Sequence, residues 1–174
     1  MSTTEYYKNT LSQLASVFSQ TAVDCVDAFF SKKSELHLSW EVVDQLQSKF
    51  DLILTIGSSN EQHSALMYAG IQYESLAAFT DTEAMPSETA ADLLGEFINT
   101  YSGMIADHEE FTEKFGILTQ ALPVLYTDGQ SYLPFIWGIQ GYVYIKHHWI
   151  YIGYTIRKNL KDQSQTGTDT LPEV

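Results

Sequence analysis

The hydrophobic residues change their spacing along this chain, and that change limits the folds it can adopt. From about Thr4 to Phe30 they recur every three or four positions, which predicts an amphipathic helix. From Leu36 to Val42 they alternate with polar residues, which predicts a strand. Later alternating segments are joined by short polar connections, as in antiparallel sheets. We therefore expect an α+β domain in which an antiparallel β-sheet packs with long α-helices.

The next elements can be placed from the same patterns. Strands are predicted at 50–56 and 67–73, with the polar run 58–63 turning the chain between them. A short helix follows around 75–79. After the Met85-Pro86 breaker, Ser87 and Glu88 offer an N-cap and an acidic first turn for a long helix that ends near Lys114. This long helix carries the residues that matter most for function.

The last third of the chain is rich in aromatic and β-branched residues, which predict two or three further strands beyond Gly116. A turn is expected at 127–130. Three glycines in this region are expected to mark bends or bulges, namely Gly138, Gly141 and Gly153. With 174 residues, 44% of them hydrophobic, the chain can form one core. We expect a single domain over 1–157 and a flexible polar tail over 158–174.

The charge of the chain excludes some partners. It has 9 Lys+Arg against 22 Asp+Glu, a formal charge of -13, whereas nucleic-acid binding needs a cationic face. No apolar run approaches the roughly 20 residues that cross a bilayer, and the first residues lack the features of a secretion signal. A single cysteine, Cys25, excludes a disulfide framework within the chain. We therefore expect a cytoplasmic protein that binds neither nucleic acid nor membrane.

The helix predicted to begin at Ser87 has two unlike faces. Its apolar side should pack on the sheet and consists of Leu94, Phe97, Ile98, Tyr101, Met104 and Ile105. Asp92, Glu96, Asn99 and Gly103 are spaced by four, three and four, so they form one row on the other side. A solvated helix face is the simple explanation. However, Asn and Gly are both poor helix formers, and a Gly beside an amide and a carboxylate would let another molecule approach closely.

This row resembles the signature of the CheC/CheX chemotaxis phosphatases. In that signature an Asp or Ser is followed after three residues by Glu, then after two residues by Asn, and four positions later by Gly. The segment from Asp92 to Gly103 matches it. A proline about two dozen residues further on completes the pattern, and Pro123 stands at that place. The order of elements is similar as far as Ile156, and the single Glu-x-x-Asn helix resembles the CheX type.

The resemblance implies a phosphatase that removes the phosphoryl group from the phosphoaspartate of a CheY-like response regulator. Asn99 would orient the attacking water, Glu96 would pair with a lysine of the receiver, and Asp92 and Gly103 would contact the partner. The protein would need no metal or cofactor of its own, because the receiver brings Mg²⁺. The resemblance also implies a homodimer. The alternative is a non-catalytic binding or adaptor protein for a receiver domain or for a flagellar or signalling partner.

Other residue groups give weaker indications. Cys25 lies on an apolar stripe, which is typical of a buried thiol. His147 and His148 are adjacent, so on a strand they would point to opposite faces and could not bind one metal together. The acidic run 107–110 lacks the spacing of a helical zinc site. The Tyr and Trp residues between 132 and 154 indicate sheet packing rather than a ligand platform.

Overall fold

The computed structural model of the chain describes residues 2–36, 40–47, 49–83, 85–127 and 137–159. Its helices are α1 (Thr3–Gln13), α2 (Ala15–Phe30), α3 (Tyr73–Thr80), α4 (Ser87–Ala106) and α5 (Glu109–Phe115). Its strands are β1 (Glu35–Leu36), β2 (Glu41–Val43), β3 (Leu52–Ser59), β4 (His63–Ile71), β5 (Thr119–Gln120), β6 (Val124–Thr127), β7 (Gly138–Ile145) and β8 (His148–Lys158).

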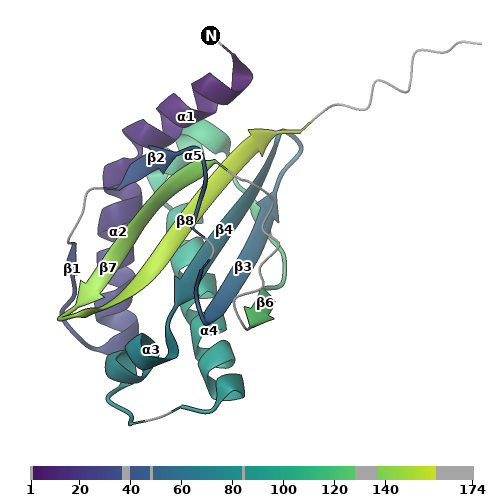
Figure 1. The fold of residues 1–174 in the computed structure, drawn as a ribbon. Helices are drawn as coiled ribbons and strands as arrows, with labels where there is room; N and C mark the ends of the chain where they lie inside the picture. Colours follow the sequence, from purple (N-terminus) through teal and green to yellow (C-terminus); the bar gives the residue numbers. More distant parts are fainter. Residues whose placement is uncertain (1, 37–39, 48, 84, 128–136, 160–174) are drawn as a thin grey trace, which may run out of the picture.

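The strands in the described ranges form one antiparallel sheet, and the long helices α2 and α4 cover one of its faces (Figure 1). The strand order is β1-β7-β8-β4-β3-β5, with β2 also paired to β7 and β6 also paired to β3. The predicted α+β class is therefore confirmed. Between the sheet and the helices lies the main core, in which Phe18, Phe97, Tyr101 and Tyr154 are among the largest buried side chains. None of the helices in this described part of the chain is both long and apolar enough to cross a membrane.

The first helix is interrupted at one residue. The pattern predicted a continuous helix to Phe30, but the backbone of Leu14 leaves helical geometry, with ψ at 8°. The Leu14 N–H still reaches the carbonyl of Thr10 at 3.2 Å, and the Phe18 N–H reaches that of Leu14 at 3.1 Å. Because the hydrogen bonds continue across Leu14, the three-and-four spacing of apolar residues continues as well. The spacing therefore could not reveal the break between α1 and α2.

Four other expected boundaries are wrong. The strand expected at 36–42 is replaced by the short strands β1 and β2, with 37–39 outside the described residues. Tyr73 begins α3 instead of ending a strand. The long helix begins at Ser87 itself, with Pro86 in the cap position and no side-chain cap bond. It ends at Ala106, where His108 N–H turns back to the carbonyl of Ile105 at 3.1 Å, and α5 starts separately.

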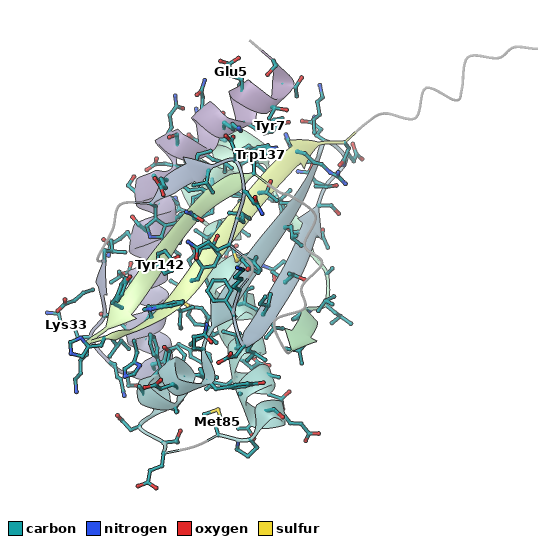
Figure 2. All side chains as sticks on the ribbon, viewed as in Figure 1. Glu5, Tyr7, Lys33, Met85, Trp137 and Tyr142 are labelled. Carbon is teal, nitrogen blue, oxygen red and sulfur yellow. The ribbon has the colours of Figure 1, made fainter. Side chains whose placement is uncertain are left out.

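A second, smaller core lies on the sheet face away from α2 and α4. Phe50, Ile53, Tyr68 and Tyr151 are buried there, with Tyr142 packed against them; Tyr142 is labelled on β7 in Figure 2. The segment that precedes β3 runs over this face, and the Gln47 N–H donates to the hydroxyl of Tyr151 at 3.0 Å. The hydroxyl of Tyr68 in turn donates to the carbonyl of Gln47. The expected sheet packing of the Tyr and Trp residues is confirmed for those of β7 and β8.

The three glycines expected at bends serve a different purpose. A Cβ on Gly141 would lie 2.2 Å from the ring of Trp40, and one on Gly138 would lie 2.3 Å from the carbonyl oxygen of Tyr154. A Cβ on Gly153 would lie 3.1 Å from Leu46. All three residues lie within β7 or β8, so they allow other groups to approach the sheet closely. The expected turn at 127–130 lies outside the described residues from position 128, and the expected tail lies outside them from position 160.

Candidate functional site

Packing fixes which side of α4 points outward. The residues that face the sheet and α2 are fully or almost fully buried: Ala90, Leu94, Phe97, Ile98, Tyr101 and Ile105. The hydroxyl of Tyr101 also donates to the carbonyl of Phe18 on α2 at 2.9 Å. Burial raises the pKa of the Tyr101 phenol well above its usual value, so the group stays a neutral donor. A helix held along this whole side cannot rotate, and its opposite side is fixed toward the surface.

The structure places the candidate residues on that outward side. Asp92, Glu96 and Asn99 are exposed and Gly103 is half-buried, so the row predicted from the helical wheel lies on one face. Among the described residues, no hydrogen bond or ion pair involves the side chain of Asp92, Glu96 or Asn99. Beside them, the Thr100 hydroxyl donates to the backbone carbonyl of Glu96 at 2.8 Å. A carboxylate and an amide with unused hydrogen-bonding capacity are thus presented side by side.

Met104 departs from the expected pattern. It was predicted to face the core with Tyr101 and Ile105, but 36% of its surface is exposed. On the wheel it lies about 120° from Asp92, at the border between the two faces. An apolar side chain therefore flanks the polar row on one side.

The surface beside Asn99 is open at Gly103. A Cβ built on Gly103 would meet nothing within 4 Å outside its own helix turn. Since φ of Gly103 is not positive and no neighbour needs the space, the fold itself gives no reason for glycine here. An inner glycine costs helix stability, and within the described part of the chain Gly103 brings no packing benefit in return.

We expect Gly103→Ala to stabilise the protein. The added methyl group meets empty space, and Ala is favoured over Gly inside a helix by about 1 kcal/mol. Thermal or chemical unfolding should therefore show a free energy of unfolding higher by roughly that amount. Gly138→Ala is the matched contrast, because its Cβ would collide with the Tyr154 carbonyl and must destabilise the protein. A loss of stability in Gly103→Ala would show that the fold needs this glycine.

The charge around the row has one sign. From residue 85 to residue 113 the sequence contains no Lys or Arg. Glu88, Asp92 and Glu96 are spaced by four, so like charges follow one another along the exposed ridge of α4. Like charges at this spacing destabilise an isolated helix by a few tenths of a kcal/mol per pair, about 0.2 to 0.5. A partner at this surface would need to supply positive charge.

The sheet edge formed by β5 and β6 lies beside α4. The side-chain amide of Gln120 on β5 donates to the hydroxyl of Ser102 on α4 at 2.9 Å. Gln120 pairs with Ser58 on β3, while Val124 on β6 pairs with Thr55. Between these two pairs β3 advances by three residues and the edge segment by four. The edge segment therefore contains one extra residue, which is a β-bulge. Pro123, the residue that completes the sequence signature, lies half-buried in this bulge.

The other chemical groups noted in the sequence do not assemble into a second site. Cys25 is buried in the core, and burial raises the pKa of its thiol to about 12, which leaves it unreactive. His147 lies in the turn before β8, and His148 is the first residue of that strand. Within the described ranges, no three His, Cys, Asp or Glu side chains are grouped so that they could hold a metal ion.

The sequence matches no protein-family profile and no curated protein sequence. Its structure, however, is similar to solved structures of chemotaxis proteins. The chemotaxis protein CheX from Vibrio vulnificus superposes with a TM-score of 0.66 at 13% identity, over 80% of this chain and 96% of the other. The chain has a CheX-like fold. CheC-like proteins from Shewanella also superpose on it, so the expected likeness to the CheC/CheX group is confirmed for the fold.

Two further structures with this fold are complexes with another protein. One is a CheX–CheY–BeF₃–Mg²⁺ complex from Borrelia burgdorferi, with a TM-score of 0.55 at 10% identity over 80% of this chain and 95% of the other. The second is FliM in a FliM–SpeE complex from H. pylori, with a TM-score of 0.58 at 11% identity over 84% and 87%. A CheX-like fold therefore occurs in proteins with different partners, and the role of this chain must be argued from its own surface.

Sequence reasoning missed that the sheet edge formed by β5 and β6 is in contact with α4. It found the row on α4 because one helix carries all four positions, and local spacing is enough to align them. The Gln120 to Ser102 contact joins residues 18 positions apart in different elements, and no local pattern announces it. The position of Pro123 in the resembling signature was the one signal that pointed to this edge.

Proposed function

We propose that this protein is a phosphatase that dephosphorylates the phosphoaspartate of a CheY-like response regulator. The observation that carries the proposal is the exposed row on α4, in which the side chains of Glu96 and Asn99 make no hydrogen bond to any described residue and lie beside the open surface at Gly103. The CheX-like fold supports it, since one protein with this fold was crystallised in complex with CheY. The proposal further includes a cytoplasmic location and a homodimer.

Under this proposal, the surface has to supply only one part of the hydrolysis reaction. A phosphorylated receiver domain holds its own Mg²⁺ and lysine around the phosphoryl group, so the partner has only to place a water molecule in line with the phosphorus. The water oxygen forms a new bond to phosphorus, and the bond from phosphorus to the aspartate oxygen breaks. The aspartate leaves as a carboxylate, and the protons of the water remain with the phosphate and the solvent. No metal or cofactor bound by this chain is required in this scheme.

Asn99 suits the task of orienting that water. Its amide carries an acceptor oxygen and a donor NH₂, so it can accept from the water and donate to a phosphoryl oxygen at the same time. The buried side of α4 holds the helix rigidly, and Asn99 therefore needs to order only its own side chain. Preorganised placement of this kind is a large part of phosphoryl-transfer catalysis.

Glu96 is placed to dock the receiver. It lies one turn before Asn99 on the same row, in a region without any Lys or Arg, so its carboxylate can pair with a cation of the partner. Asp92, one turn further back, extends the same charged edge as a flanking contact. A carboxylate that meets a lysine of the receiver would fix the position of Asn99 over the phosphoryl group.

We expect Glu96→Gln to weaken receiver binding about tenfold and to make the remaining affinity less sensitive to salt. A charge contact across an interface contributes to association and is screened as ionic strength rises. Binding should be measured by titration calorimetry at several salt concentrations. Glu35→Gln, an exposed carboxylate on β1, is the control and should bind as the wild type does. Unchanged affinity and salt slope in Glu96→Gln would show that this carboxylate does not contact the receiver.

The proposal is tested directly by a dephosphorylation time course. Receiver domains phosphorylated on aspartate should lose inorganic phosphate faster when catalytic amounts of this protein are added, with many turnovers per molecule. A binding or adaptor protein is the alternative, since another protein with this fold, FliM, was crystallised in complex with SpeE. Such a protein would hold the phosphorylated receiver without raising the rate of phosphate release, and that result would replace the phosphatase assignment.

A further inference from the structure

An open cavity of about 980 Å³ lies at the end of the sheet where α1 begins. Its walls come from the first turns of α1, from the turn between β3 and β4, and from the end of β8, which lie at the same end of the molecule (Figure 1). Small-molecule sites typically have volumes of about 300 to 1,000 Å³. None of the described lining residues belongs to α4, β5 or β6, so the cavity is separate from the candidate site.

Strand β8 extends past β7 at this cavity. Ile139 of β7 is paired with Tyr154 of β8, so Gly138, the first residue of β7, stands opposite Thr155. Residues 156–158 are therefore paired with β4 on one side and, within the described ranges, with no strand on the other. A strand with one free side lets side chains from both of its faces turn toward the same space.

Two cations at this free end of β8 line the cavity. Arg157 and Lys158 are successive strand residues, so their side chains leave opposite faces of the sheet and reach the cavity around the free side of the strand. Both are exposed, and neither forms an ion pair with a described residue. Glu61 is the one carboxylate among the described lining residues. Positive charge therefore predominates in this wall, although the whole chain carries -13.

Hydrogen bonds hold this wall in place before any ligand binds. The side chain of Asn159 donates to the carbonyl of Asn60 at 2.8 Å, which ties the end of β8 to the turn between β3 and β4. The Asn60 side chain accepts from the His63 N–H at 2.8 Å and donates to the carbonyl of Phe115 at 2.9 Å. Tyr7 of α1 packs edge-on against His63, with ring centroids 5.9 Å apart. A preformed cavity of this kind has little ordering cost to meet when a ligand binds.

The other lining groups complete a donor set for phosphate. Thr3 and Thr4 on α1 and Ser59 on β3 add hydroxyl groups. A phosphate has more acceptor sites than a carboxylate, and guanidinium, ammonium and hydroxyl groups all donate to it. The rings of Tyr7 and Trp137, labelled near each other in Figure 2, supply an apolar wall. Tyr7 is 4% exposed and Trp137 packs against the main core, so both rings are fixed.

We propose that this cavity binds a small phosphate ester that carries a ring in its organic part. Arg157 and Lys158 hold the phosphate group, and the ring lies against Tyr7 and Trp137. The negative charge of the rest of the protein repels anions, so binding depends strongly on these two cations. The inference adds a ligand site to the protein and does not rest on the proposed function.

The experiment measures the binding of phenyl phosphate and AMP to the full chain by titration calorimetry. We expect both probes to bind at least tenfold more tightly than inorganic phosphate, which lacks the ring, and AMP at least tenfold more tightly than adenosine, which lacks the phosphate. Arg157→Gln should lower the affinity for both probes at least tenfold, because a guanidinium–phosphate contact is charge-assisted. Lys33→Gln is the matched control, since Lys33 is also exposed but follows α2 and does not line the cavity.

Trp137→Leu tests the apolar wall separately. It should lower the affinity for phenyl phosphate and AMP and leave the affinity for inorganic phosphate unchanged. Because Arg157 is exposed, Arg157→Gln should melt as the wild type does, and it keeps the inference testable even if Trp137→Leu fails to fold.

Three results would overturn the inference. If neither probe bound at millimolar concentration, the cavity would not be a phosphate-ester site. Equal affinities in Arg157→Gln and wild type, or an equal loss in Lys33→Gln, would show that the probes bind elsewhere or through overall charge. Probes that bound no more tightly than inorganic phosphate would show that no ring is recognised. Receiver dephosphorylation does not enter these measurements, so the proposed function and this inference can fail separately.

Discussion

Asn99→Ala should remove most of the phosphatase activity and leave the fold intact. The side chain is exposed and makes no hydrogen bond to any described residue, so its removal breaks nothing within the protein. Ala is also the better helix former, and stability should therefore be unchanged or slightly higher. Loss of an ordered water at the reacting centre costs about 100-fold in rate, the penalty typical of a misplaced reactant. Receiver dephosphorylation, normalised to folded protein, measures the first effect and the thermal midpoint measures the second.

Two neighbouring variants make this test specific. Asn99→Asp keeps the size of the side chain but loses the NH₂ donor, so it should be nearly as inactive as Asn99→Ala if the amide acts on the water and phosphoryl group. Thr100→Ala, one position along the helix, removes only a hydroxyl that bonds to the Glu96 carbonyl and should retain activity. An Asn99→Ala protein that melts early, or that is folded and fully active, would show that the row is structural, and the binding-protein alternative would then be preferred.

The parts of the fold that the sequence predicted are those that depend on neighbours along the chain. The two faces of α4 follow from one helical period, so Tyr101 was placed in the core and Asn99 outside it. Alternation likewise predicted β3 and β4 within a few residues. Both signals work because each side chain's direction follows from the backbone of its own segment.

The parts that could not be predicted depend on contacts between distant segments. Gly153 reads as a bend in the sequence, yet it is glycine because Leu46, over a hundred positions earlier, packs onto it. The bulge at Pro123 appears only when the pairing of Gln120 and Val124 with β3 is known. The 86% exposure of Leu122 is equally invisible, because an apolar residue in a strand-like segment is normally assigned to a core. Only part of the candidate site could therefore be predicted from the sequence. Local spacing aligns the row on α4, whereas the position of the sheet edge beside α4 is known only from the tertiary structure.

Tyr101→Ala should be the most destabilising substitution on α4, although Tyr101 lies only two positions from Asn99. Its ring is fully buried, stacks with Phe97 at a centroid distance of 6.4 Å, and its hydroxyl bonds to the carbonyl of Phe18. Truncating a buried aromatic to alanine costs about 3 to 5 kcal/mol. In a domain of this size each kcal/mol lowers the thermal midpoint by about 2 to 4 °C, so a fall of roughly 10 °C is expected.

Tyr101→Ala and Asn99→Ala should differ in the property that is lost: stability in the first variant and activity in the second. In Tyr101→Ala the fraction that stays folded should still present Glu96 and Asn99, so activity per folded molecule should remain close to wild type. Tyr101→Phe divides the loss further, because it keeps the ring and removes only the hydroxyl that bonds to α2; leaving the Phe18 carbonyl with one bond fewer costs about 1 kcal/mol. Unfolding by denaturant with parallel activity assays gives both quantities for each variant. If Tyr101→Ala melted as the wild type does but had lost its activity, the buried side of α4 would belong to the catalytic machinery, and the separation of the helix into a structural and a functional face would be wrong.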